Sequence, residues 1–214
     1  MSSTAPILDD ERAAPAGGGA DLDVSSIRML ELRHRIKNLL AIVQAVTNQT
    51  LRSGRSIEEA RKALNGRLSA MGEAVDMLLA TAWSEGGLHE LIARALVGER
   101  DRVEVHGPEL TLGPDAVMAL SLVFHELESN SMKYGALSSD AGRVTIGWSL
   151  DDGRLSLSWE ERDGPPCAPP LREGFGSRMI AKLVGGRFKG ASETDYRADG
   201  LRWTLRAPLS GLAS

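Results

Sequence analysis

A histidine among basic side chains is the first group in the sequence that could take part in phosphoryl chemistry. His34 lies between Arg33 and Arg35, and Lys37 follows three residues later. An imidazole is a nucleophile, and neighbouring cations can offset the charge of an incoming phosphate. The same pattern is also typical of an ordinary exposed histidine on a helix, so these residues predict a phosphoacceptor only together with a site that holds a phosphate donor.

Such a site is indicated by three polar residues in an otherwise apolar segment. Glu126 and Asn130 are four residues apart and Lys133 follows three later, so all three share one face of a helix. A carboxylate, an amide oxygen and an ammonium in one line could bind a magnesium–triphosphate unit, with oxygen for the metal and a cation for the phosphates. The alternative is a polar stripe that is merely solvated.

Two glycine-containing turns follow. The segment Trp159–Pro165 places carboxylates at a strand end before Gly164, where one could accept a hydrogen bond from an adenine amino group. The segment Gly174-Phe175-Gly176-Ser177 opens a predicted helix at 177–184, where small residues let backbone N–H groups approach phosphate.

Two long amphipathic helices must position the histidine. The first has apolar residues at alternating spacings of four and three, and the second begins at Ser56 with Glu59 three residues later, which indicates a capping box. If Leu32 and Ile36 face the seam of a hairpin, His34 faces outward. One hairpin leaves an apolar face uncovered, which favours a homodimer as a four-helix bundle. The positions of the two stripes are Leu32, Ile36, Leu39, Val43, Val46 and Thr50, then Ile57, Ala60, Leu64, Leu68, Met71, Val75, Leu78 and Ala82.

The remaining sequence predicts an α+β layer sandwich with helices on one face of a mixed sheet. Strands are expected at 103–105, 144–150, 155–160 and 201–205, with a long helix at 114–134. The predicted organisation is a tail at 1–23, a helical hairpin at 24–83, an α/β domain at 84–209 and a short tail at 210–214.

Composition excludes several classes of protein. The 214 residues carry a formal charge of −4, whereas an overall nucleic-acid-binding surface is normally strongly basic. The single cysteine, Cys167, cannot form an intrachain disulfide, and no apolar run approaches the roughly 20 residues that cross a bilayer. We therefore expect a cytoplasmic protein that neither inserts into membranes nor binds nucleic acid.

The region around His34 resembles the H-box of HWE and HisKA_2 sensor histidine kinases, on residues 31–38, 43–46 and 49–50. The resemblance implies that His34 is the phosphoacceptor and that Arg35 and Asn38 belong to the same box. Asn38 could hydrogen-bond the phosphoryl group or position a water. Many histidine kinases have an acidic residue just after the histidine; here Arg35 stands there, which leaves Glu31 as the candidate general base.

The segment 125–137 resembles the N-box of the same kinases, within the GHKL superfamily of Bergerat-type ATP-binding domains. The resemblance implies that Asn130 holds Mg²⁺, that Lys133 contacts phosphate, and that the site is lined by His125 and Glu126, with Tyr134 in the same box. The segment departs from the family at Glu128, Ser131 and Met132. Glu128 lies two residues from Glu126, so its side chain is expected to point elsewhere.

The two turns resemble the G1 and G2 boxes of the family. Asp163 stands where the family commonly has glycine, so either Glu161 or Asp163 could accept from adenine, and Glu161 is favoured. Gly164 belongs to the first turn, and Gly174, Phe175, Gly176 and Ser177 form the second. The resemblance covers roughly residues 26–208, with its boxes in the expected order.

The resemblance implies an ATP-dependent protein-histidine kinase that uses Mg²⁺, phosphorylates His34 and passes the phosphoryl group to an aspartate in a response-regulator receiver domain. A separate protein could supply the sensory input. Two alternatives stay open: a dimeric phosphotransfer protein with a vestigial nucleotide domain, and a GHKL-type ATPase or serine kinase acting on a partner. Binding of Mg·ATP separates the first alternative from the kinase.

Overall fold

The computed structural model describes residues 19–51, 56–169 and 175–213. The chain divides into two compact units, Met1–Ala45 and Val46–Ser214. The first unit contains most of helix α1 (Gly19–Leu51). This helix begins inside the stretch 1–23 that the sequence predicted to be a tail. Asp21 and Asp23 near its start favour a helix there, because carboxylates interact well with the positive end of the helix dipole.

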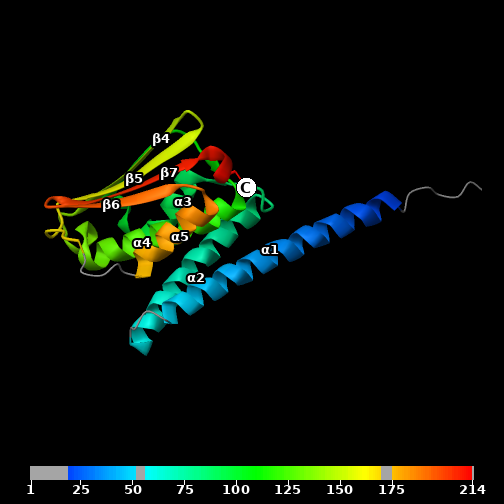
Figure 1. Cartoon of the computed structure of the whole chain (residues 1–214), viewed down its shortest axis with the longest axis horizontal. Coiled ribbons are helices and arrows are strands. Elements are labelled where there is room, and N and C mark those ends of the chain that lie inside the picture. Colours follow the sequence, from blue (N-terminus) through cyan, green and yellow to red (C-terminus); the bar gives the residue numbers. More distant parts are fainter. Residues whose placement is uncertain (1–18, 52–55, 170–174, 214) are drawn as a thin grey trace, which may run out of the picture. The chain divides into compact units, whose positions relative to one another are not determined.

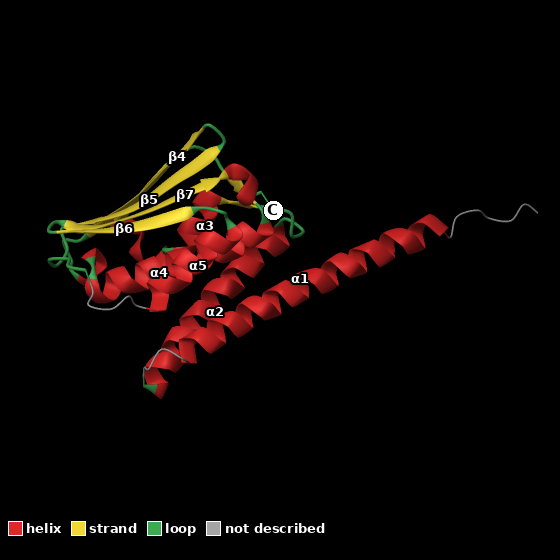
Figure 2. Cartoon of the chain, in the orientation of Figure 1, coloured by secondary structure: helices red, strands yellow, loops and turns green. Residues whose placement is uncertain are grey.

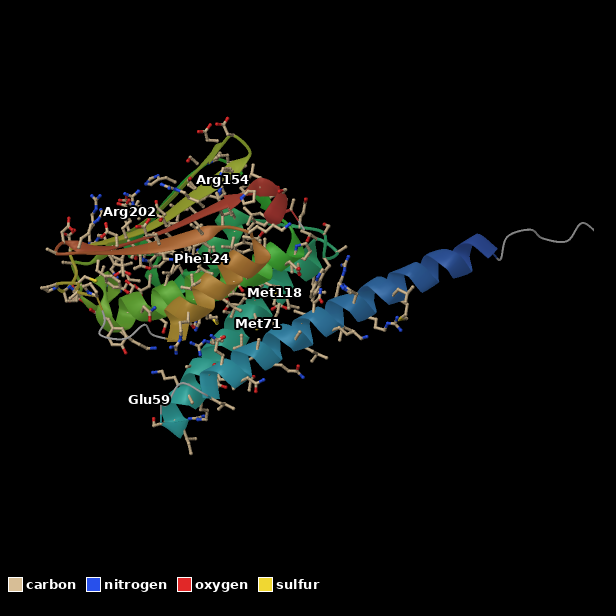
Figure 3. The ribbon with its side chains drawn as sticks, in the orientation of Figure 1. Glu59, Met71, Met118, Phe124, Arg154 and Arg202 are labelled. Carbon is tan, nitrogen blue, oxygen red and sulfur yellow. The ribbon has the colours of Figure 1, made fainter. Side chains whose placement is uncertain are left out.

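Helix α2 (Ile57–Ala80) begins with the predicted capping box. The Ser56 side chain accepts a hydrogen bond from the backbone N–H of Glu59 at 3.3 Å, and the Ser56 backbone N–H donates to the Glu59 carboxylate at 2.9 Å. Glu59 is labelled at this end of α2 in Figure 3. Both interactions satisfy donors that the first turn of a helix leaves without partners. The predicted turn at residues 52–55 lies outside the described part of the chain.

The buried face of α2 differs from the predicted one at several positions: Ile57, its first residue, is 89% exposed, and Ala82 lies beyond the end of the helix and is exposed. Met71 and Leu78 are buried as expected, but Arg67 is 2% exposed while Leu68 is 37% exposed. The prediction that Leu68 faces the core is therefore wrong. Arg67 takes that face because it has a buried acidic partner on another helix, described below, and because Met71 and Ala74 continue its stripe at the spacing of a helix face.

A five-stranded sheet in the order β2-β4-β5-β7-β6 forms the centre of the second unit. Strand β2 runs parallel to β4, and the other neighbours are antiparallel. Helices α3, α4 and α5 cover one face of this sheet (Figures 1 and 2), which confirms the predicted α+β sandwich. The elements are β2 (Val103–His106), β4 (Arg143–Asp151), β5 (Arg154–Arg162), β6 (Ala191–Arg197), β7 (Gly200–Pro208), α3 (Leu88–Ala95), α4 (Pro114–Tyr134) and α5 (Phe175–Arg187).

The core lies between the sheet and α4. Alternate strand residues such as Ile146 and Trp159 point inward and are fully buried, as a sheet covered on one face requires. Met118 and Phe124 of α4 belong to the same core, whereas Arg202 lies on the side of the sheet away from the helices (Figure 3). Burial of both the strand and helix faces fixes the direction in which the polar residues of α4 point.

Short elements and the chain's last turn account for the remaining differences. The sequence patterns did not predict α3 or the two-residue pair of β1 (Gly86–Gly87) and β3 (Thr111–Leu112), and the four expected strands do not include β6. Short 3-10 turns lie at Val97–Arg102, Ala136–Ser138 and Leu209–Gly211. The predicted tail at 210–214 is wrong for Leu212, which is 1% exposed and whose carbonyl accepts from the Gly113 N–H at 2.7 Å.

Candidate functional site

The imidazole of His34 lies on the surface of α1. Arg33 and Lys37 beside it are also exposed, and Arg35 is half-buried. The side-chain nitrogen of Asn38, one turn later, lies 3.5 Å from His34 Nδ1. This places Asn38 against one ring nitrogen and leaves Nε2 on the other side of the ring. The side chain of Glu31, the candidate general base, lies outside the described part of the structure.

Helix α4 carries the predicted triphosphate residues at the end of a buried segment. Pro114 stands in its first turn, where its missing N–H costs nothing, and Val117 to Phe124 are buried. The helix emerges from the core near Asn130, Lys133 and Tyr134, which are exposed. The Lys133 ammonium donates a hydrogen bond to Ser129 Oγ at 2.8 Å. The change from buried to exposed along one helix puts polar groups at the edge of the sandwich.

A cavity of about 330 Å³ opens beside this exposed end of α4. It contains two residues that the sequence assigned to nucleotide binding from separate motifs, Asn130 and Glu161. Asp163 does not border it, so Glu161 is the carboxylate of the first turn that reaches the cavity. The rest of the wall is largely apolar with a few hydroxyl groups: Leu127, Pro169, Ile180, Ala181, Ser192, Thr194, Tyr196, Leu201 and Trp203.

The Glu161 carboxylate is 5% exposed and is held from two sides. The Ala136 backbone N–H donates to Oε2 at 2.7 Å, and the Trp159 indole N–H donates to Oε1 at 2.9 Å. These bonds tie the end of β5 to the turn after α4. A carboxylate has about four acceptor positions, so Glu161 can still accept a hydrogen bond from the cavity side.

Two positions in the first turn have conformations that favour glycine. A Cβ on Gly164 would lie 2.5 Å from the Ala136 Cα, so a larger residue would displace backbone. Asp163, which is exposed, has φ of +58°. Asp is one of the few residues that adopt this left-handed conformation with little penalty, which explains how it replaces the family's glycine.

His125 and Glu126 face helix α2 rather than the cavity. Arg67 Nε donates to Glu126 Oε1 at 2.7 Å, and a Cβ on Gly66 would lie 2.8 Å from the His125 ring. Burial lowers the pKa of His125; the charge of Glu126 opposes this effect, while Arg67 and Lys133 act with burial. The half-buried His125 ring is therefore a neutral group packed on α2.

Glu128 points into a different cavity, of about 260 Å³, between α2, α3 and α4. This agrees with the expectation that its side chain faces away from the Asn130 site. Burial, together with the charges of Glu99 and Glu73, raises the pKa of Glu128 to about 7. The extra carboxylate thus affects the packing of α4 on its neighbours.

The replacement Glu128→Gln is expected to stabilise the protein at pH 8 but not near pH 4.5. Between pH 4.5 and about 7 the unfolded carboxyl is ionised while the folded one keeps its proton, so stability falls as pH rises through this window. Allowing for solvent at a half-buried position, removing a penalty of about 1 kcal/mol raises Tm by roughly 2–4 °C at pH 8. Thermal melts at both pH values measure this. The exposed Glu104→Gln is the control, and an equal gain at both pH values would contradict the assignment.

The second glycine turn is described only in part. Gly174 and the side chains of Phe175 and Ser177 lie outside the described residues. Gly176, in the first turn of α5, is buried, and a Cβ there would collide with Glu126 Oε2. Gly176 thus allows the Glu126 carboxylate to approach the start of α5 closely.

Arg67 belongs to this region and was missed by the sequence analysis, which named its partner Thr50 only as a member of the H-box and of the first helical stripe. Both are buried, and Arg67 Nη1 donates to Thr50 Oγ1 at 2.8 Å. The signal for Arg67 was its place three residues after Leu64 and four before Met71, since an arginine inside an apolar stripe requires a buried acceptor.

Comparison with known proteins gives a consistent assignment. Residues 31–109 match the family described as HWE histidine kinase. The chain is similar to proteins named blue-light-activated histidine kinase, with 35% identity over 188 residues in Brucella ovis and 32% in Brucella anthropi. Each alignment covers 84% of this chain but only 38% of the Brucella protein.

Solved structures agree at the level of the fold. The histidine kinase domain from the Erythrobacter litoralis EL346 blue-light activated histidine kinase superposes with a TM-score of 0.59 at 17% identity, covering 85% of this chain and 90% of that domain. The longer EL346 structure gives a TM-score of 0.60 at 20% identity, covering 94% of this chain and 62% of that one. The helical part followed by a sandwich domain is therefore a fold that the chain shares with these two structures.

Within the described residues, every helix is too short or too polar to span a membrane. The H-box predicted from the sequence lies inside the matched region, whereas the predicted N-box at 125–137 lies beyond it. The sheet-containing unit has the expected fold. Over residues 31–109, the chain therefore matches the HWE histidine kinase family.

Proposed function

We propose that the chain is an ATP-dependent protein-histidine kinase of a cytoplasmic two-component system, which phosphorylates its own His34 and transfers the phosphoryl group to a receiver-domain aspartate. The observation that carries this proposal is the cavity beside α4. Asn130 and Glu161 come from motifs some 30 residues apart and were assigned to the same nucleotide from sequence, and both line this one cavity.

The residues of the cavity fit a nucleotide. A volume of about 330 Å³ lies within the range of ligand pockets, which starts at about 300 Å³. Leu127, Ile180 and Trp203 offer apolar surface to a purine ring, and the Glu161 carboxylate offers an acceptor for its amino group. Asn130 would hold Mg²⁺, which when bound supplies positive charge against the triphosphate. Lys133, one turn further, would contact phosphate.

In the proposed reaction an unprotonated ring nitrogen of His34 forms a bond to the γ-phosphorus while the phosphorus–oxygen bond to ADP breaks, and the ring proton leaves to a base. Arg35 and its basic neighbours would balance the charge of the phosphoryl group. Asn38 would orient the ring or the phosphoryl group, which its 3.5 Å contact with Nδ1 supports. Glu31 remains the candidate base.

We further propose that the chain works as a homodimer. Met29, Leu30, Ile36 and Leu40 of α1 are 48–64% exposed in the single chain, a concentration of apolar surface that pairing into a four-helix bundle would cover. A receiver domain would then dock on the helices beside His34, and a separate sensor protein could supply the signal.

The kinase is tested by incubating the chain with Mg·ATP labelled at the γ-phosphate. We expect a label that acid removes and alkali does not, as for phosphohistidine, and its transfer to a receiver domain that has the acceptor aspartate but not to an aspartate-to-alanine version. The phosphotransfer alternative predicts no label from ATP and no binding of Mg·ATP by calorimetry. The intact cavity with Asn130 favours the kinase.

A further inference from the structure

A continuous line of buried polar contacts runs through the second unit. Thr50 Oγ1, near the end of α1, donates to the Val46 carbonyl at 2.6 Å and accepts from Arg67 Nη1 at 2.8 Å. Arg67 Nε donates to Glu126 Oε1 at 2.7 Å. The two charged side chains are 2% and 7% exposed. Arg67 therefore joins the helix that carries His34 to the helix that carries Asn130.

The line continues to the start of α5. The second carboxylate oxygen, Glu126 Oε2, lies so close to Gly176 that a Cβ there would overlap it. Gly176 belongs to the turn that we assign to the phosphates. The Glu126 carboxylate therefore packs against this turn at Gly176, and the hydrogen bond from Arg67 holds the carboxylate in that position.

The Arg67–Glu126 pair lies in a closely packed part of the second unit. Met71, Ala74, Met77 and Leu78 on the same face of α2 are all at most 5% exposed. A Cβ on Gly86 would contact both Met77 and Val117, which places the last turns of α2 against α4. Separating Arg67 from Glu126 by moving α2 would expose this apolar surface, at about 25 cal/mol per Å².

We propose that Arg67 is a positioning residue for phosphoryl transfer, which acts through Glu126 on the first turn of α5. The proposal rests on the proposed kinase function. Arg67 does not line the cavity; it holds the Glu126 carboxylate that packs against Gly176. A lysine could not replace it, because the contacts to Thr50 and Glu126 use two nitrogens of one planar guanidinium group.

The expected effect falls on the rate rather than on binding of the nucleotide. The adenine end of the nucleotide is held by the cavity walls around Glu161, which do not include Arg67 or Glu126. A small displacement of the phosphate turn misaligns the γ-phosphate, and a shift of about 1 Å can lower a rate by roughly 100-fold. Loss of Arg67 should therefore lower kcat with little change in KM for Mg·ATP.

The test compares Arg67→Met with Arg61→Met in the full chain. Arg61 lies on the same helix, is exposed and pairs with the exposed Glu58, so it controls for loss of an arginine. Autophosphorylation is measured against Mg·ATP concentration. We expect Arg67→Met to lower kcat by at least about 10-fold with KM within about threefold, and Arg61→Met to match the wild type.

Two further variants distinguish a loss of positioning from a general loss of folding. If Arg67 acts through Glu126, the effects of the two substitutions on the rate overlap. The double variant Arg67→Met/Glu126→Gln should then be as active as the less active of its two single variants. Thr50→Val removes only the neutral end of the line, and should lower kcat by about threefold with an unchanged KM even where Arg67→Met does not fold.

The outcomes separate this inference from the proposed function. If the wild type forms phosphohistidine but Arg67→Met and Thr50→Val keep its kcat, the inference alone is wrong. A higher kcat in Arg67→Met would also overturn it, because the pair would then restrain the enzyme. Absence of label in the wild type would overturn the proposed function, and the positioning role with it.

Discussion

Replacing His34 with glutamine is expected to abolish the acid-labile phosphorylation of the chain, a loss of at least roughly 1,000-fold. Glutamine has a similar length and keeps hydrogen-bonding groups, but its amide nitrogen has no available lone pair to form a bond to phosphorus. His34 is on the surface of α1, so the change should not disturb packing. Labelling with γ-labelled Mg·ATP measures the loss, and calorimetry should show unchanged binding of Mg·ATP.

His106 provides a matched control for this experiment. It is also exposed, on strand β2, and its Nε2 lies 3.5 Å from Glu104. His106→Gln should incorporate label at the wild-type rate. Full labelling of the His34→Gln protein would show that another residue accepts the phosphoryl group and would remove the phosphoacceptor assignment.

The replacement Asn130→Ala is expected to weaken binding of Mg·ATP on the order of 100-fold and to remove most of the dependence of binding on Mg²⁺. The amide oxygen of Asn130 is the proposed metal ligand, and Mg²⁺ tolerates few substitutes for a well-placed oxygen. Asn130 is exposed at the cavity, so its loss leaves no unpaired group in the core. Titration of ATP with and without Mg²⁺ by calorimetry gives both quantities.

Asn65→Ala serves as the comparison, because Asn65 is an exposed asparagine on α2, outside the cavity. The affinity of this variant for Mg·ATP, and the dependence of binding on Mg²⁺, should equal those of the wild type. Retention of full Mg²⁺ dependence in Asn130→Ala would mean that the metal is held elsewhere, and that the line of polar residues on α4 has another purpose.

Strong local signals made several elements predictable from sequence. The helix predicted at 114–134 is α4 (Pro114–Tyr134), and the capping box at Ser56 and Glu59 is formed. These succeed because the information is local: proline in a first turn, a hydroxyl three residues before a carboxylate, and a periodic apolar face. The four predicted strands are all present because each is an alternating run between turn residues.

The sequence could not predict which side chains face partners on distant elements. The face of α2 was assigned through Leu68, but the stripe shifts to Arg67 because Glu126 supplies the compensating charge. Glu126 and Asn130 share one face of α4, yet one meets α2 and the other a cavity. Spacing along a helix predicts a shared direction and cannot predict where a neighbouring helix ends.

The wall of the cavity includes Trp203, opposite the apolar residues of α5. An indole is a fluorophore whose emission responds to the polarity of its surroundings, and a purine stacked against it would quench it. The protein thus contains its own optical reporter of cavity filling, and occupancy can be followed without labelling the chain or the nucleotide.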